Sequence, residues 1–268
     1  MQYASIILLA LVFIPLERMQ PRYPEQKTFR RNWVTDVMHL LFNGFLVRGG
    51  FALLIGSAVV AYRSAVGADA SAWVRDLPMV VQLIGVIIVG DIGYYIAHRS
   101  SHAIPFLWKF HAVHHSSEEM DWLASNRLHP IDQIYASTWQ MLPIFFAGFS
   151  TGAVAIYVLI YKIHSLLQHS NVRVNFGPFK WVFCSPDFHH WHHANQREAY
   201  DKNFASQLPI IDLIAGTHFL PDRDPDKYGL REDMPDHYHQ QLLHPFLQIL
   251  DGWKQRGKQK GKTDEQEA

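Results

Sequence analysis

Apolar residues are gathered into a few long stretches that short polar segments separate. The first covers residues 3–16, and three longer ones cover residues 36–62, 78–97 and 131–163. A helix that crosses the hydrocarbon core of a bilayer needs about 20 residues. The three longer stretches therefore predict membrane spans. The first predicts a short or tilted helix that ends near Pro15, because proline interrupts helices.

The longest stretch is broken by the segment AGFSTG at residues 147–152. Glycine and serine clusters of this kind favour a turn, so residues 131–163 predict two helices joined as a tight hairpin. We therefore expect an all-α fold, an integral membrane bundle of about four transmembrane helices. A soluble protein with very apolar core helices is the alternative. The mean hydropathy of −0.06 favours it only weakly, because the polar linkers and tail lower this mean.

Basic residues in the short loops predict the orientation of the bundle. The segment after the first helix carries five of them, whereas the segment between residues 62 and 78 carries two, Arg63 and Arg75. Lys and Arg accumulate on the cytoplasmic side. By alternation, residues 98–127 and the chain after residue 164 should also face the cytoplasm.

The end of the chain changes in character. Residues from 254 onward are charged and of low complexity, and such a composition favours disorder. We therefore expect residues 1–253 to form one domain, with its functional core at residues 80–220, and residues 254–268 to be a disordered polar tail.

Composition excludes several classes of function. The 24 basic and 24 acidic residues balance, so no basic surface for nucleic acid is expected. The single cysteine, Cys184, excludes an intramolecular disulfide framework and a CxxC metal or redox pair. Histidine is unusual in number, at seventeen residues. The chemistry of this chain should therefore depend on imidazole.

Three groups of histidines have helical spacing, HxxxH once and HxxHH twice. They are His98 and His102; His111, His114 and His115; and His189, His192 and His193. Residues three or four apart share one face of a helix. Clustered imidazoles repel each other when protonated and need partners when buried, and a bound metal removes both costs. We therefore predict that these eight rings are metal ligands.

Other histidines have less regular positions. His164 and His169 are five residues apart, about 140° on a regular helix, so both can bind metal only at a helix end or a π-bulge. His169, in Gln-His-Ser-Asn, is the better candidate, while His190 is expected to face away. His129 is equally compatible with a ligand and with a residue that covers the site. Eight to ten imidazoles exceed what one ion accepts, which predicts two ions; imidazole alone does not distinguish Zn, Cu, Fe and Ni.

This box arrangement resembles the fatty acid hydroxylase and sterol desaturase superfamily of membrane di-iron oxygenases. Other segments agree with it: DIGYYIAHR from residue 91, RLHP from 127, QHSNV from 168, DKN from 201, and Asp212 with Gly216 and Thr217. The similarity covers residues 80–220. One departure is the extra histidine at position 190.

The resemblance implies two iron ions, with Zn able to replace them in purified protein. The ligands would be His98, His102, His111, His114, His115, His164, His169, His189, His192 and His193, and all of these except His164 would also be catalytic. The ions would lie at the cytoplasmic mouth of the bundle under a helical cap. The implied reaction is O₂-dependent hydroxylation or desaturation of an unactivated C–H bond in a lipid or sterol. Electrons would come from a separate ferredoxin or cytochrome, because the sequence has no cysteine set for an iron–sulfur cluster.

Acidic residues are expected to support the ligands, because the ring N–H of a metal-bound histidine usually donates to a carboxylate or carbonyl. Asp91, Asp187 and Asp212 are candidates for this role, with Asn203 and His129 as further ones. The substrate is expected to enter between helices from the bilayer. The alternative function is a histidine-rich metal transporter, or a metal-binding protein without redox chemistry. Transport predicts ionisable residues in the middle of spans, whereas here the boxes lie beyond the span ends.

Overall fold

The computed structural model describes residues 2–67 and 71–266, and no β-strand occurs within these ranges. The helices in chain order are α1 (Gln2–Met19), α2 (Trp33–Val66), α3 (Ala72–Arg75), α4 (Met79–Ala103), α5 (Pro105–His115), η1 (Ala124–Asn126), α6 (Pro130–Ala147), α7 (Thr151–His169), η2 (Gly177–Trp181), α8 (Pro186–His192), η3 (Arg197–Ala199), α9 (Ile210–Ala215) and α10 (Tyr238–Gln266). The all-helical expectation is confirmed for the described residues.

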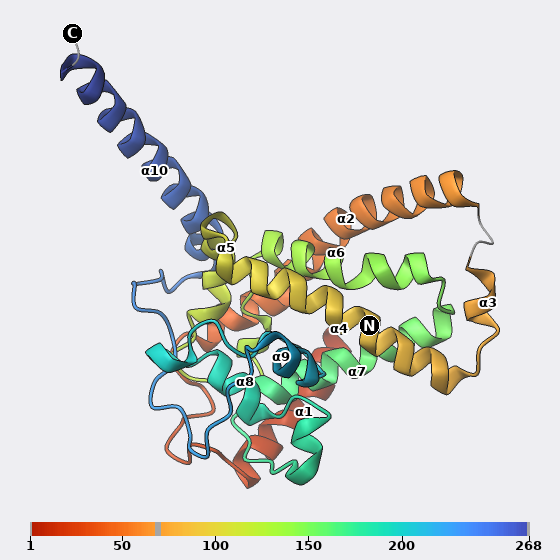
Figure 1. The fold of residues 1–268 in the computed structure, drawn as a ribbon. Helices are drawn as coiled ribbons and strands as arrows, with labels where there is room; N and C mark the ends of the chain where they lie inside the picture. The colour runs from red at the N-terminus through yellow and green to blue at the C-terminus, as the bar shows by residue number, and fades with distance from the viewer. Residues whose placement is uncertain (1, 68–70, 267–268) are drawn as a thin grey trace.

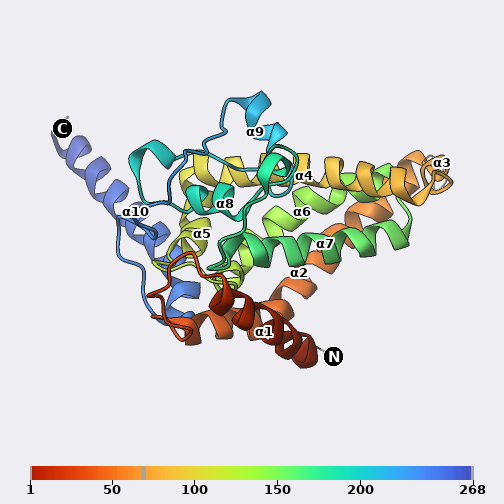
Figure 2. The ribbon, with the colours of Figure 1, turned by 90° about the horizontal axis from the view of Figure 1, so that it is seen from below.

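Helices α2, α4, α6 and α7 run side by side and form the elongated body of the molecule (Figures 1 and 2). Each of them contributes to one core, whose buried side chains are Ile55, Val86, Met141, Ile144 and Tyr157. The predicted break into two helices is confirmed, because α6 ends at Ala147 and α7 begins at Thr151, and α4 packs against both of them. Gly148 allows the reversal by adopting a φ of 80°, a conformation that glycine adopts without steric cost.

The outer surface of the body is apolar. On α4, Ile84, Ile88, Ile92 and Ile96 follow each other at four-residue intervals and are 43–55% exposed. A helix in a soluble protein normally turns such a stripe toward the core. Among the described residues, α2, α4 and α7 are long and apolar enough to cross a membrane. These features identify a membrane protein.

The chain reverses sharply between α4 and α5. Ile104 has an extended backbone, with φ −101° and ψ 113°, and Pro105 begins α5. A residue before proline is disfavoured in the α conformation, so the helix axis must change here. Helices α5 and α8 lie at the same end of the bundle, and α3 lies at the opposite end (Figure 2).

Both terminal helices are longer than expected. Helix α1 continues through Pro15 to Met19, because one proline removes a single intrahelical hydrogen bond and does not always end a helix. Helix α10 extends away from the body as far as Gln266 (Figure 1), although the sequence predicts disorder from residue 254. The Lys, Gln and Glu of this segment have high helix propensity. Residues 267 and 268 lie outside the described residues.

Candidate metal centre

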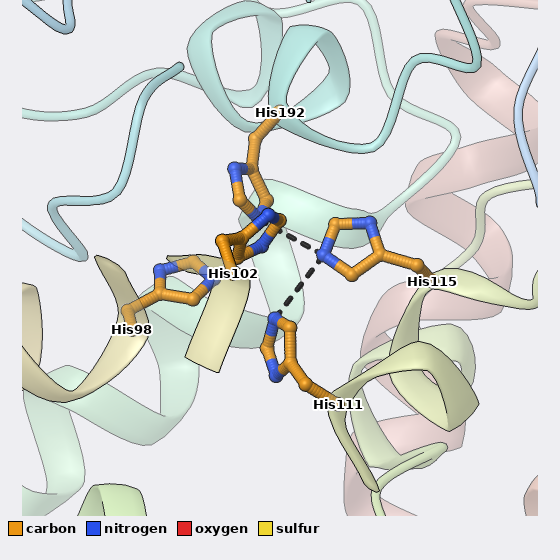
Figure 3. A group of neighbouring side chains, drawn as sticks. All are labelled: His98, His102, His111, His115 and His192. Carbon is orange, nitrogen blue, oxygen red and sulfur yellow. Dashed lines mark hydrogen bonds between the residues drawn. The ribbon is translucent and has the colours of Figure 1, made fainter. Parts of the chain in front are cut away.

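Nine histidines converge at the α5 and α8 end of the bundle and form two groups. Group one is His98, His102, His111, His115 and His192; group two is His114, His169, His189 and His193. Within each group, one nitrogen of every ring lies within 4.8 Å of those of the others. All nine rings except that of His102 are buried. Figure 3 shows the rings of group one turned toward one another from α4, α5 and α8.

Each HxxHH box is divided between the two groups. His111 and His115 belong to group one, whereas His114, between them, belongs to group two. In the last box His192 belongs to group one and its neighbour His193 to group two. The pairs spaced by four residues therefore stay together. The two groups consequently share α5 and the chain around α8 and are neighbouring parts of one centre.

The rings approach one another through their Nε2 atoms. The Nε2–Nε2 distances are 3.2 Å for His111 and His115, 3.1 Å for His115 and His192, 3.2 Å for His114 and His169, 3.0 Å for His169 and His189, and 3.1 Å for His189 and His193. Ligand nitrogens at ~2.0–2.1 Å from one metal ion are separated by roughly 3.0–3.4 Å. The spacing is therefore that of a coordination shell.

The hydrogen bonds of the other ring nitrogen decide whether these contacts are hydrogen bonds. His114 donates from Nδ1 to the carbonyl oxygen of Arg127 at 3.1 Å, and His169 donates from Nδ1 to that of Ser165 at 2.7 Å. A carbonyl only accepts, and a neutral imidazole has a single N–H. Both Nε2 atoms therefore carry lone pairs, which face each other at 3.2 Å. Two facing acceptors repel, and a cation bound between them would remove the repulsion.

Burial favours the neutral form of four rings outside the candidate spans. It lowers the pKa of His192 to about 3. Burial, followed by the neighbouring imidazoles, lowers the pKa of His115, His189 and His193 well below the ordinary value. Metal binding requires the unprotonated ring. Near neutral pH these nitrogens are therefore available as ligands without the loss of a proton.

Asp132 supports the centre, and the sequence did not single it out. His111 donates from Nδ1 to Oδ2 of Asp132 at 3.1 Å, and both side chains are buried. This contact orients the His111 ring and fixes its tautomer. Asp132 lies in the first turn of α6, where an acid is common because it stabilises the helix N-terminus. Nothing in the sequence distinguishes it from such an acid.

The three acids that were predicted to accept from imidazole do not contact the rings. Asp91 and Asp212 accept backbone N–H groups from residues 204–208 instead. Asp187 is paired with Arg22, and its side chain is 42% exposed. The rings of His98, His114, His169 and His192 donate to backbone carbonyls. A carbonyl performs the same task as a carboxylate, and sequence does not reveal which carbonyls will be near.

His164 belongs to neither group and corrects the ligand list. Its Nε2 donates to the carbonyl oxygen of Cys184 at 2.8 Å. Helix α7 is regular as far as His169, so the five-residue offset turns His164 away from the centre. From the sequence we expected His164 and His169 to bind metal together only if a π-bulge or a helix end lay before His169.

His129 and Asn203 have structural contacts. His129 is the N-cap of α6, since its Nδ1 accepts from the backbone N–H of Ile131 at 3.1 Å. Its Nε2 donates to the carbonyl oxygen of Leu242 at 3.1 Å, so neither nitrogen is free for a metal. Asn203 binds backbone groups of Phe188 and Phe219 and no imidazole.

His190 also has both ring nitrogens engaged. Its Nε2 donates to the carbonyl oxygen of Ser170 at 3.1 Å, and its Nδ1 accepts from the hydroxyl of Tyr228 at 2.7 Å. We expect His190→Gln to keep the full metal content of the wild type, whereas His189→Gln loses about half of it. Elemental analysis of the two purified variants tests this. Equal losses in both would contradict the assignment of His190.

A cavity of about 480 Å³ reaches the centre. It is lined by His102, His115 and His192 of group one and by His193 of group two. Its other walls belong to α5, α10 and the loops at residues 194–201 and 229–234. Among the described residues, His102 is the only one of the three candidate spans that lines it. The walls of this cavity thus come mainly from α5, α10 and the loops.

Comparison with known proteins gives a consistent result. The family model for fatty acid hydroxylase matches residues 83–217, half of the chain. Ornithine lipid hydroxylase OlsE of Rhizobium tropici is 28% identical in an alignment of 262 positions, which covers 91% of this chain and 74% of the relative. The alkylglycerol monooxygenases of Xenopus tropicalis and Homo sapiens are 31% and 32% identical over 140 residues, which are 52% of this chain. The chain spans only 31% of the length of these two relatives. No solved structure matches.

The matched region contains α4 from residue 83 onward and all of α5, α7 and α8, and hence all nine converging histidines. Hydroxylases and monooxygenases are oxidoreductases. The hydroxylase relative covers most of this chain, and the human monooxygenase covers half of it. The resemblance of the histidine boxes is thereby confirmed: the chain belongs to the fatty acid hydroxylase family and is an oxidoreductase of that family.

Proposed function

We propose that this protein is a di-iron oxygenase that hydroxylates or desaturates an unactivated C–H bond of a membrane lipid. Group one and group two would each hold one iron. The observation that carries the proposal is the pair of lone pairs on His114 and His169, which face each other at 3.2 Å while both Nδ1 atoms donate to carbonyls. Buried neutral imidazoles in this arrangement fit a divalent metal.

The protein side of the reaction follows from the surroundings of the rings. Side-chain acids and bases cannot break an aliphatic C–H bond, so bound iron would supply the activation of O₂ for this step. The residues of the chain hold the ions in place and exclude water, since eight of the nine rings are buried. Asp132 fixes the ring of His111. The cavity beside His102 and His115 gives the reacting part of the substrate access to both groups.

A lipid substrate is supported by the relatives and by the surface. The relatives are named for an ornithine lipid and for alkylglycerols, and the body of this protein exposes apolar helix faces.

Hydroxylation and desaturation share the removal of the first hydrogen atom. Their outcomes diverge with the position of the second C–H bond relative to the centre.

The topology that accompanies this function is a four-span bundle. Helix α6 would cross the membrane beside its hairpin partner α7, in addition to α2 and α4. Lys and Arg are enriched in residues 17–33, which lie at the same end as the histidines, and this supports a cytoplasmic centre capped by α5 and α8. Residues 1–253 would form the single domain. Electrons would come from a separate ferredoxin or cytochrome.

Metal analysis and lipid analysis test the proposal together. Protein purified without oxygen is expected to contain about two irons per chain. Cells that produce the protein should accumulate lipids that have gained one oxygen atom or lost two hydrogen atoms, relative to cells that produce His192→Ala. A metal transporter or a non-redox metal-binding protein would load metal without changing any lipid. One iron per chain, or none, would contradict the di-iron centre.

A further inference from the structure

A loop between η3 and α9, residues 201–208, passes beside group one and is held by buried acids; we call it the strap. Oδ1 of Asp91 on α4 accepts the backbone N–H of Ser206 at 2.8 Å. Oδ2 of the same carboxylate accepts those of Gln207 at 3.1 Å and Leu208 at 2.6 Å. Asp91 is completely buried. One carboxylate thus binds three consecutive amides and joins the strap to a helix of the bundle.

A second acid holds the other half of the strap. The carboxylate of Asp212 on α9 accepts the backbone N–H of Phe204 at 2.8 Å and that of Ala205 at 2.7 Å. It also accepts the hydroxyl of Thr217 at 2.6 Å. Five consecutive amides of the strap therefore bind two buried carboxylates. Each of these amides donates to a side-chain oxygen of Asp91 or Asp212, so this loop is fixed at close intervals.

The start of the strap has an unusual backbone. Asp201 and Asn203 have φ of 57° and 60°, a left-handed conformation that is rare outside glycine and is best tolerated by Asn and Asp. The Asn203 side chain donates to the carbonyl oxygens of Phe188 and Phe219. An Asp201 carboxylate oxygen lies 3.7 Å from Nδ1 of His102. This conformation is therefore maintained by specific contacts next to group one.

The strap orients two further rings of group one through its carbonyls. His98 donates from Nδ1 to the carbonyl oxygen of Phe204 at 2.7 Å, and His192 donates from Nδ1 to that of Lys202 at 2.8 Å. Each bond fixes the tautomer and leaves the Nε2 lone pair directed into the group. Nε2 of His98 has no partner among the described residues.

We propose that Asp91 and Asp212 are positioning residues, which act through the strap to aim the rings of group one. The inference rests on the proposed metal centre. The group-two rings His114 and His169 depend on the carbonyls of Arg127 and Ser165, outside the strap. Loss of the strap should therefore affect the ion of group one and spare that of group two.

The test compares Asp91→Ala with Gln82→Ala. Both residues are buried on α4 and each binds three backbone groups, but Gln82 lies at the opposite end and binds those of Arg75, Leu77 and Ser150. Equilibrium dialysis of metal-stripped protein against Zn²⁺ gives stoichiometry and affinity. We expect two ions for wild type and Gln82→Ala. For Asp91→Ala we expect one tight ion and a second weakened by about 10–100-fold, the usual effect of removing a partner of a ligand.

Double variants identify the ion that is lost. Asp91→Ala combined with His189→Ala in group two should bind no tight ion, whereas Asp91→Ala combined with His115→Ala in group one should bind one. Asp91→Asn, which keeps one acceptor oxygen, should fall between wild type and Asp91→Ala. Two tight ions in Asp91→Ala, or equal weakening of both, would overturn the inference.

Hydrogen exchange of the metal-free protein separates this inference from the proposed function. In Asp91→Ala the strap amides should exchange faster, and the amides of α7 should be unchanged. Faster exchange without two ions in the wild type would contradict the di-iron proposal while supporting the strap. Unchanged exchange of the strap amides in Asp91→Ala would overturn the inference that Asp91 holds the strap, whatever metal the wild type binds.

Discussion

The His192→Ala variant is expected to lose the ion of group one and to convert lipid more than 100-fold more slowly than the wild type. Nε2 of His192 lies 3.1 Å from that of His115, and its ring packs against those of His98 and His102 with centroids 4.3 and 4.9 Å apart. Replacing a partner of a ligand typically costs about 10–100-fold in affinity or activity, and a ligand should cost more. Iron content and product formation measure the two effects.

His237→Ala is the control, because His237 is exposed just before α10 and its ring stacks on that of His239, far in the sequence from the histidine boxes. Its metal content and activity should equal those of the wild type. Unfolding temperature distinguishes loss of metal from loss of fold, since the removal of His192 also leaves the carbonyl of Lys202 without its donor. Full activity in His192→Ala would refute the site assignment.

The spacing of histidines predicted which residues would converge. Eight rings were selected because HxxxH and HxxHH place imidazoles on one helix face, and all eight lie in the two groups. His169 was preferred over His164 as a ligand. In the structure His169 lies in group two, whereas His164 binds the carbonyl oxygen of Cys184. Helical geometry places the rings of each box on a common face, because the angular positions of side chains are fixed once the segment is a helix. The preference for His169 came instead from its Gln-His-Ser-Asn context.

The spacing of the histidines in the sequence could not predict which ring joins which group. Residues four apart are offset by about 40° around a helix, whereas adjacent residues are offset by about 100°. His111 and His115 therefore point the same way, and His114 points to one side of them. Whether that angle leads to the same ion or to another depends on where α7 and α8 lie, and this is a property of the tertiary packing.

The partners of the rings were also hidden from sequence. Acids were expected to accept from imidazole because they are recognisable in a sequence, but four rings use carbonyls, and every residue has one. Asp91 stood out in the sequence as an acid inside an apolar stretch, and it was expected to accept from an imidazole. Its contacts, three amides more than a hundred residues away, depend on how the strap folds back onto α4.

The precision of the centre depends in turn on how closely the bundle helices approach, and Gly93→Ala should disrupt this approach. A Cβ atom at Gly93 would lie 2.2 Å from the carbonyl oxygen of Trp139 on α6 and 3.3 Å from Cα of Gln140. These are backbone atoms, so the two helices must separate. Overpacking usually costs about 1–3 kcal/mol, and a clash with backbone should reach the upper end. A clear fall in the unfolding temperature of the metal-free protein in detergent is expected.

The separation should also reach the metal, because α4 carries His98 and α6 carries Asp132, the acceptor for His111. Zn²⁺ affinity at group one should therefore fall together with stability in Gly93→Ala. Gly49→Ala on α2 is the control, since a Cβ there has no heavy atom within 4 Å and alanine favours helix over glycine by about 1 kcal/mol. That variant should be as stable as the wild type or more so. If both variants unfolded at the wild-type temperature, close contact between α4 and α6 could not be what sets the geometry of group one.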